Sequence, residues 1–144
     1  MSPMSDLMPP KWEDAWDDPL AAALRDDFSE IIESARSLAG DLTLEVHLEA
    51  IADVCAALKD RHKFTLLLDV SGADYPQREP RFDVIYHVYS FEANRRVRLR
   101  VRTDDATPVP SVTRVWRGAN WPEREVFDIH GVRFAGHPLL KEPS

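Results

Sequence analysis

The sequence is poor in cysteine and glycine and has no long apolar run, and each shortage excludes a class of function. The single cysteine, Cys55, excludes an intrachain disulfide, and the chain alone cannot supply the thiolates of an iron–sulfur cluster. Five glycines leave no phosphate-cradling glycine-rich loop. No apolar stretch approaches the roughly 20 residues of a membrane-spanning helix. The amino terminus lacks the basic and apolar regions of a secretory signal, so a reducing, cytoplasmic setting is expected.

The chain is acidic overall, but its charge is unevenly distributed. At 144 residues it is most simply one domain with a core of its own, and its net charge is -7. Residues 1–60 hold 4 basic and 14 acidic side chains, whereas residues 61–144 hold 14 and 11. An acidic half beside a mildly basic half favours a polar interaction surface over a general affinity for phosphate backbones.

Hydrophobic periodicity predicts an α/β fold of the α+β sandwich type. Asp18 and Pro19 form a helix start, in which aspartate caps the first turn and proline occupies the first helical position. Alternating and continuous apolar patterns predict the further elements, namely strands at 30–37, 41–48, 64–70, 82–91 and 95–103 and a helix at about 49–61. We expect a mixed, mainly antiparallel sheet backed by two helices, plus a short carboxy-terminal helix.

This pattern divides the chain into three parts: a flexible amino-terminal tail at 1–18, an α/β domain at 19–118, and an interaction helix with its tail at 119–144.

Residues 64–70 are continuously apolar, as in a strand covered on both faces, and 71–76 are loop formers. Cys55 falls on the apolar stripe of its helix and is expected in the core.

The strand at 95–103 carries an arginine at every second position. These arginines therefore line one face of the sheet, while the aliphatic residues between them face the core. The four arginines are Arg96, Arg98, Arg100 and Arg102. A basic stripe is one signature of an RNA-binding domain. Because the chain is acidic and the stripe has no interleaved aromatics for base stacking, a solvated or partner-facing surface with arginines paired to carboxylates is favoured, and no nucleic acid is expected.

The five histidines show no recognised metal-binding spacing. His87 lies in an aromatic strand and is expected to be a core or interface residue. Glu123 and Glu125 with His137 are the candidates for an acid/base or metal enzyme, but such a site also needs a cleft and an orienting partner. We expect no catalytic, cofactor-binding or metal-binding residue in this chain.

The segment ANWPEREVFDIHG, at 119–131, is predicted to be a short helix. Asn120 is the expected cap, and Glu123 completes a variant of the capping box. Arg124 and Asp128 stand four residues apart, which is close enough to form an ion pair. Gly131 is suited to the left-handed conformation that ends a helix.

This helix also places two aromatic residues, Trp121 and Phe127, among its charges. Charges that are partly buried require partners, and the short terminal segment offers too few of them. A second polypeptide is therefore the expected source of those partners.

The run VPSVTRVWRGANWPEREVFDIHGVRFAGHP resembles the hallmark segment of the C subunit, the 30 kDa-type subunit, of bacterial proton-pumping NADH:quinone oxidoreductase (respiratory complex I). The segments 72–76 and 86–90 also look like this family, and the resemblance covers roughly residues 19–138. The positions that match the family pattern are Pro110, Ser111, Val112, Trp116, Ala119, Trp121, Glu123, Arg124, Glu125, Phe127, Asp128, Gly131, Phe134, Gly136, His137 and Pro138.

The resemblance implies a non-catalytic structural subunit of the hydrophilic arm of the complex. It implies docking on the large D subunit, which helps to form the quinone site, and proximity to cluster-bearing subunits, with FMN, iron–sulfur clusters and quinone held by those partners. It implies a peripheral position on the cytoplasmic side of the inner membrane, reached through partners. The implied partner interface consists of Trp121, Glu123, Arg124, Glu125, Phe127, Asp128, His137 and Pro138, with Arg96, Arg98, Arg100 and Arg102 as a second contact.

Two features depart from the family pattern. His130 stands where the family usually has Phe or Leu, and the chain ends at Ser144 where family members usually continue with a longer tail that wraps the neighbouring subunit. Membrane-bound [NiFe] hydrogenases and related dehydrogenases share this module, so the equivalent subunit of such a complex is the alternative. The RNA-binding domain and the acid/base or metal enzyme are remoter alternatives.

Overall fold

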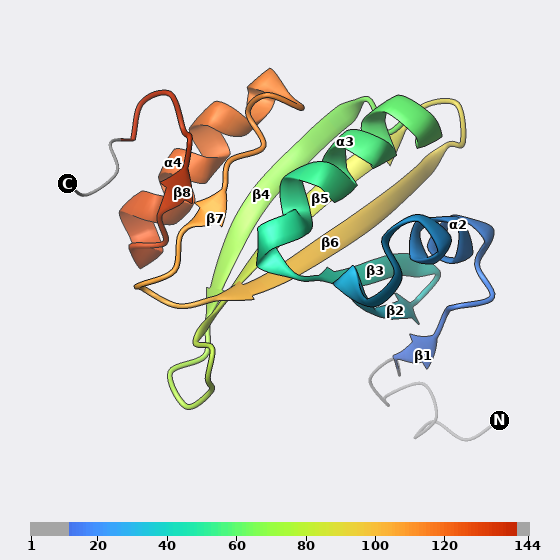
Figure 1. The fold of residues 1–144 in the computed structure, drawn as a ribbon, viewed down its shortest axis with the longest axis horizontal. Helices are drawn as coiled ribbons and strands as arrows, with labels where there is room; N and C mark the ends of the chain where they lie inside the picture. The colour runs from blue at the N-terminus through green and yellow to red at the C-terminus, as the bar shows by residue number, and fades with distance from the viewer. Residues whose placement is uncertain (1–11, 141–144) are drawn as a thin grey trace, which may run out of the picture.

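A computed structural model describes residues 12–140, which form a six-stranded sheet with helices on one face and α4 beside its last strand (Figure 1). Three short 3-10 helices join the longer elements: η1 (Ser29–Ile31), η2 (Leu48–Ala50) and η3 (Arg117–Ala119). The longer elements are β1 (Glu13–Asp14), α2 (Pro19–Phe28), β2 (Ile32–Leu38), β3 (Asp41–Val46), α3 (Ile51–His62), β4 (Leu66–Asp74), β5 (Phe82–Ser90), β6 (Arg95–Thr103), β7 (Val109–Pro110), α4 (Asn120–His130) and β8 (Phe134–Ala135).

The strand order in the sheet is β1-β2-β3-β6-β5-β4, and all neighbours are antiparallel except β3 and β6. The short strands β7 and β8 form a separate parallel pair. The predicted α+β class, with a mixed and mainly antiparallel sheet backed by helices, is confirmed. The parallel step between β3 and β6 follows from the chain path, because α3 and the β4–β5 hairpin intervene before the chain returns beside β3.

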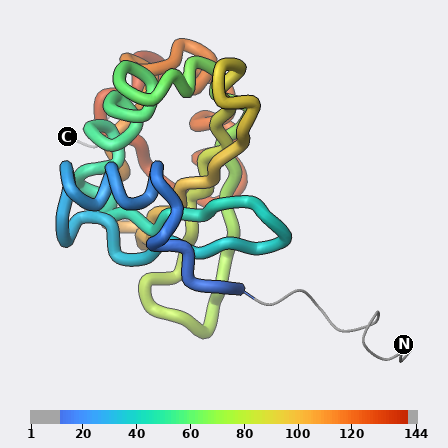
Figure 2. Tube along the Cα trace, turned by 90° about the vertical axis from the view of Figure 1, so that its right-hand side faces the viewer, coloured from blue at the N-terminus to red at the C-terminus, as the bar shows by residue number. Residues whose placement is uncertain are grey.

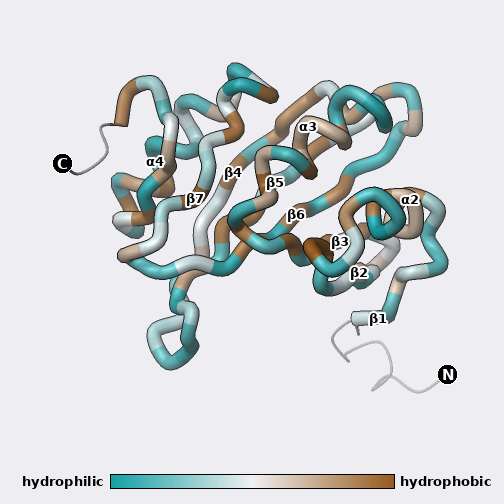
Figure 3. Tube along the Cα trace, in the orientation of Figure 1, coloured by the Kyte–Doolittle hydropathy of each residue, from teal (hydrophilic) through white to brown (hydrophobic). Residues whose placement is uncertain are grey.

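Helices α2 and α3 cover one face of the sheet, and α3 lies across β5 and β6 in Figure 1. Leu44, Leu58 and Leu99 are fully buried between these layers, and Tyr86 lies in the same core. Hydrophobic residues alternate with hydrophilic ones along the central strands (Figure 3), so the opposite face of the sheet is polar. The loop between β4 and β5 projects from the rest of the fold in both Figure 1 and Figure 2.

Most predicted elements are confirmed, but the region around β4 differs from the prediction. Among the described residues β4 is an edge strand that pairs only with β5, and Leu66 and Leu68 on it are 37% and 46% exposed. The expectation of a strand covered on both faces is therefore wrong. The predicted loop at 71–76 is also wrong over Ser71–Asp74, because these residues pair with β5. Cys55 is fully buried on α3, and burial raises the pKa of its thiol well above the usual value.

The predicted tail at 1–18 joins the fold over its last residues, whereas residues 1–11 lie outside the described part of the chain. Glu13–Asp14 pair with β2, which adds β1 to the sheet. Asp18 caps α2 as predicted, because its Oδ1 accepts the N–H groups of Leu20 at 2.9 Å and Ala21 at 3.2 Å. An ion pair with Arg95 ties the same carboxylate to β6.

Candidate functional site

Helix α4 packs against β4, and Gly72 on β4 makes this close approach possible. A Cβ atom at Gly72 would lie 2.6 Å from Cδ2 of His130 and 3.2 Å from a methyl carbon of Val126. The helix ends at Gly131, whose φ of 74° is left-handed and whose N–H donates to the Phe127 carbonyl at 2.8 Å. His130 thus fills the space beside Gly72, and its ring lies 5.9 Å from the ring of Phe82.

The side chain of Glu123 points into the protein and is fully buried. Its Oε1 accepts a hydrogen bond of 2.6 Å from the Ser111 hydroxyl, and its Oε2 accepts one of 2.9 Å from the Val112 N–H. Burial raises the pKa of Glu123, while these two bonds act in the opposite direction. The predicted capping box is wrong, because the carboxylate binds the preceding loop and Asn120 makes no side-chain cap.

His137 is also buried, and its surroundings fix the position of its proton. Nδ1 accepts the N–H of Leu139 at 3.1 Å, so the proton of the neutral ring lies on Nε2. Nε2 then donates to the Asn120 carbonyl at 2.8 Å and lies 4.0 Å from Oε1 of Glu123. His137 therefore ties the segment after β8 to the start of α4.

The structure does not bring together the three side chains of the enzyme hypothesis. Glu123 and His137 are enclosed in the protein, whereas Glu125 is exposed and accepts the Trp121 indole N–H at 2.8 Å. Over residues 12–140, no group of three or more His, Cys, Asp or Glu side chains is arranged to hold a metal ion. Over the same residues, no helix is long and apolar enough to cross a membrane.

The outer side of α4 exposes large apolar residues among charges. Trp121 is 64% exposed and Ile129 is 74% exposed, and Leu139 beyond the helix is 61% exposed. The Arg124 guanidinium lies 5.9 Å from the centroid of the Trp121 ring. The predicted Arg124–Asp128 ion pair is wrong, since no ion pair joins these two described residues.

The predicted arginine face exists on β6, and carboxylates neutralise half of it. Glu45 on β3 binds Arg100 at 3.2 Å and Arg102 at 2.7 Å. Asp83, which is almost fully buried on β5, lies 3.9 Å from Arg100 and also binds Arg78. The neutralisation comes from the two strands that flank β6.

The other two arginines, Arg96 and Arg98, have no carboxylate partner within the described residues. His87 pairs with Arg98 across the β5–β6 ladder and is half-buried. Burial lowers the pKa of His87, and the positive charge of Arg98 lowers it further. Asp69, which pairs with His87 across the β4–β5 ladder, and Asp41 act on this pKa in the opposite direction. Arg96 and Arg98 therefore offer guanidinium groups without an ion-pair partner among the described residues, beside a His87 whose pKa is lowered.

Sequence reasoning assigned no role to three groups that organise these surfaces. Ser111 and Asp83 gave no local signal, because their partners lie on other elements. Glu45 was detectable, since it alternates with Leu44 and Val46 and must point to the polar face of β3. The pairing of Glu45 with the arginines became evident only with the strand order.

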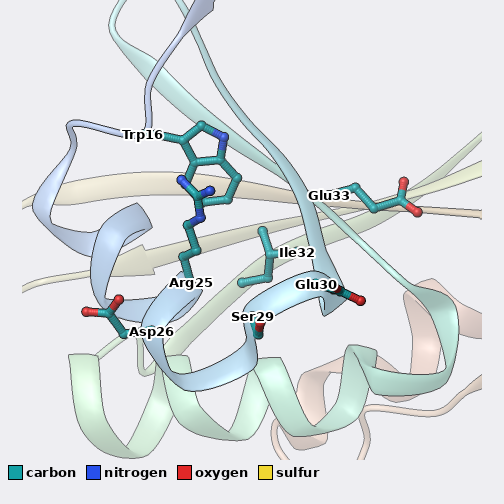
Figure 4. Close-up of a pocket in the computed structure, with 7 residues that line it drawn as sticks. All are labelled: Trp16, Arg25, Asp26, Ser29, Glu30, Ile32 and Glu33. Carbon is teal, nitrogen blue, oxygen red and sulfur yellow. The ribbon is translucent and has the colours of Figure 1, made fainter.

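A separate cleft of about 450 Å³ lies beside α2, where the Arg25 guanidinium packs 4.6 Å from the Trp16 ring (Figure 4). Asp26, Glu30 and Glu33 also line it. The stacked pair fixes the chain just before α2.

Comparison with solved structures shows where this fold occurs. A chain in the structure of the membrane-bound sulfane sulfur reductase (MBS), an archaeal respiratory membrane complex, superimposes with a TM-score of 0.75. The match covers 90% of this chain and 76% of that chain at 22% sequence identity, which shows the fold alone. The fold is therefore one that occurs in a respiratory membrane complex.

The family follows from the sequence comparisons. The family model described as respiratory-chain NADH dehydrogenase, 30 Kd subunit, matches residues 44–143, and the chain belongs to this family. The NADH-quinone oxidoreductase C subunit of Phenylobacterium zucineum (strain HLK1) is 50% identical over 102 residues, covering 71% of this chain and 49% of the relative. The NADH-quinone oxidoreductase C subunit of Bartonella bacilliformis (strain ATCC 35685 / KC583 / Herrer 020/F12,63) is 44% identical over 124 residues, covering 85% of this chain and 60% of the relative. The chain thus spans about half the length of these curated relatives.

Proposed function

We propose that this chain is a structural subunit of the hydrophilic arm of NADH:quinone oxidoreductase. Membership of the 30 kDa subunit family and the sequence identity shared with the two curated relatives support this assignment. In this proposal FMN, the iron–sulfur clusters and quinone are bound by partner subunits, and this chain supplies contacts only. It lies on the cytoplasmic side of the inner membrane and reaches the membrane through its partners.

The observation that carries the proposal is the exposed surface of α4. Trp121 and Ile129 are exposed by 64% and 74%, and a large aromatic or aliphatic side chain among charges is typical of a protein contact. We infer that the quinone-site subunit covers this surface. Leu139, which follows the helix in the chain, is 61% exposed as well.

The residues of the expected interface divide into an outer and an inner set. The outer set offers charges and apolar area to a partner and consists of Trp121, Arg124, Glu125, Phe127, Asp128 and Pro138. The inner set, Glu123 and His137, is buried and acts by fixing α4 on the fold. Arg124 and Asp128 have no ion-pair partner within the described residues, so a neighbouring subunit can supply both.

The polar face of β6 is the second contact in this proposal. Arg100 and Arg102 are held by Glu45, so they contribute little free charge. Arg96 is exposed and Arg98 is half-buried, and these two offer the cationic part of the surface. An acidic surface of a neighbouring subunit matches this part.

Purification of the tagged full chain from its native host, with mass spectrometry of the proteins recovered, tests the assignment. Recovery of the other NADH dehydrogenase subunits, the quinone-site subunit included, supports it. Recovery of [NiFe] hydrogenase subunits instead supports the alternative that this module serves such a complex. If neither set of subunits is recovered, both assignments are contradicted.

The double variant Trp121→Ala, Ile129→Ser tests the docking surface in the same experiment. Phe91→Ala is the matched control, because Phe91 is 69% exposed but lies at the β5–β6 turn. Loss of partners in the double variant and retention in the control are expected. Equal recovery of partner subunits with the double variant and with the control would contradict docking through α4.

A further inference from the structure

Three buried donors on the polar face of the sheet have no hydrogen-bond partner within the described residues: the Thr43 hydroxyl, Nε of Arg98 and Nε of Arg100. Thr43 pairs with Arg98 across the parallel β3–β6 ladder, and Arg100 stands two residues further on the same face of β6. Buried donors are nearly always satisfied in folded proteins. Three neighbouring exceptions therefore indicate an acceptor that binds among them.

A cavity of about 50 Å³ lies at this position. Thr43 and Arg100 line it together with Ser34, Arg36 and Trp12. Thr43 is only 8% exposed, so its unpartnered hydroxyl is a buried donor in the wall. The Trp12 ring lies 5.7 Å from the Arg98 guanidinium carbon and covers this part of the sheet. The space is large enough for a small polar group.

The charge around the cavity favours an anion. Arg36 and Arg98 have no carboxylate partner in the part of the chain that the structure describes. Arg100 is shared between Glu45 at 3.2 Å and Asp83 at 3.9 Å, yet its Nε remains unbonded. Asp14 stands opposite Arg36 across the β1–β2 ladder, and Glu45 accepts the Ser34 hydroxyl at 3.3 Å, so Arg98 is the guanidinium near the cavity that keeps an uncompensated charge. A charged acceptor pairs with it more strongly than a neutral one.

We propose that the cavity under Trp12 binds a carboxylate group. A carboxylate is planar, has three heavy atoms, and accepts up to about four hydrogen bonds, which suits both the space and the donors. A tetrahedral phosphate matches these donors less well, because it is larger than a carboxylate and is not planar. The carboxylate comes from a free small acid or from an acidic side chain of a neighbouring subunit, and the second source rests on the proposed function.

Titration of the isolated full chain with acetate, followed by NMR, tests the site. Saturable shifts of the Thr43 amide and the Trp12 indole N–H are expected. Thr43→Val keeps the shape and the β-branched side chain but removes the hydroxyl, and should weaken acetate binding roughly tenfold. Thr65→Val is the matched control, because Thr65 is exposed and far along the chain from the cavity, and should bind as the wild type does.

Two results would overturn the proposal. One is a linear, non-saturating response to acetate, or an equal response in Thr43→Val. The other is inorganic phosphate binding the same residues as tightly as acetate. Because the titration uses no partner protein, its outcome is independent of the proposed function.

A second measurement identifies the source of the carboxylate. If Thr43→Val weakens acetate binding and also lowers recovery of partner subunits, the acid belongs to a neighbouring subunit. If acetate binding is weakened and recovery is unchanged, the site takes a free small acid. Both outcomes require the acetate result and leave the site itself established.

Discussion

The backbone N–H of Val112 donates a 2.9 Å hydrogen bond to Oε2 of Glu123, and this bond joins the loop before α4 to the helix itself. The Ser111 hydroxyl donates to the other carboxylate oxygen at 2.6 Å. The β7–β8 pairing thus ends at Ser111, and a buried carboxyl group instead of a backbone carbonyl accepts the N–H of Val112. The exposed face of α4 depends on this inner contact for its position.

Removal of the Glu123 carboxylate should destabilise the fold. Glu123→Ala leaves the Val112 N–H buried without an acceptor and creates a cavity, which should lower the free energy of unfolding by roughly 2–4 kcal/mol. Glu123→Gln should lower it much less, because the amide oxygen accepts from Val112 and the amide NH₂ donates to the Ser111 hydroxyl. Urea denaturation of both variants measures the difference. Equal losses in the two variants would show that the amide of glutamine does not replace the carboxyl group in these hydrogen bonds.

The Glu123 carboxyl should also make stability depend on pH. Burial raises its pKa in the folded protein above the usual 4.5. The stabilising contribution of the protonated form is therefore fully present below about pH 4.5 and is lost as pH rises through the folded-state pKa. The free energy of unfolding of the wild type, relative to Glu123→Gln, should fall as pH is raised from about 4 to neutral. A difference that rises with pH would mean that the hydrogen bonds outweigh burial.

Gly72 should be required for the contact between β4 and α4. Gly72→Ala places a Cβ 2.6 Å from His130, and this overlap should lower the free energy of unfolding by roughly 1–3 kcal/mol. His130→Ala removes the ring with which this Cβ would overlap. The double variant should therefore lose less than the sum of the two single variants, measured as a double-mutant cycle. If the losses of the two single variants simply add in the double variant, the steric overlap of Gly72→Ala is not with the His130 ring.

Arg124→Ala should impair assembly more than folding. Its side chain is exposed, lies 5.9 Å from the centroid of the Trp121 ring and has no ion pair among the described residues, so the free energy of unfolding should change by about 0.5 kcal/mol or less. Arg117→Ala, at an exposed position just before α4, is the matched control. Blue-native electrophoresis of membranes complemented with each variant gives the amount of assembled complex. Full assembly with Arg124→Ala, or an equal loss with Arg117→Ala, would contradict a specific role.

The sequence predicts most of this fold because local signals and tertiary packing agree along most of the chain. The Asp18–Pro19 pair starts α2 where expected, and the alternation at 95–103 gives β6 and its arginine face. The strand predicted at 64–70 forms as β4, but it is not covered on both faces, for a tertiary reason. Its continuous apolar run is typical of a central strand, but the strand order places β4 at the edge, where α4 shields only part of it.

The sequence identified which residues belong to the candidate site, but not how their side chains are arranged. The spacing of Asn120 and Glu123 matches a capping box, and only the position of the 111–112 loop reveals that Glu123 has partners elsewhere. This also changes the argument for a partner protein. The buried carboxyl group of Glu123 finds its hydrogen-bond partners within the chain, so the support for docking comes from the exposed Trp121 and Ile129 instead.

Site-specific photo-cross-linking within the native complex tests the central claim most directly. A photoreactive phenylalanine analogue replaces Trp121 in one sample and Phe91 in the other, since both positions are exposed. We predict a cross-link to the quinone-site subunit from position 121 and none to that subunit from position 91. An assembled complex in which position 121 forms no cross-link to any other subunit would contradict docking through α4.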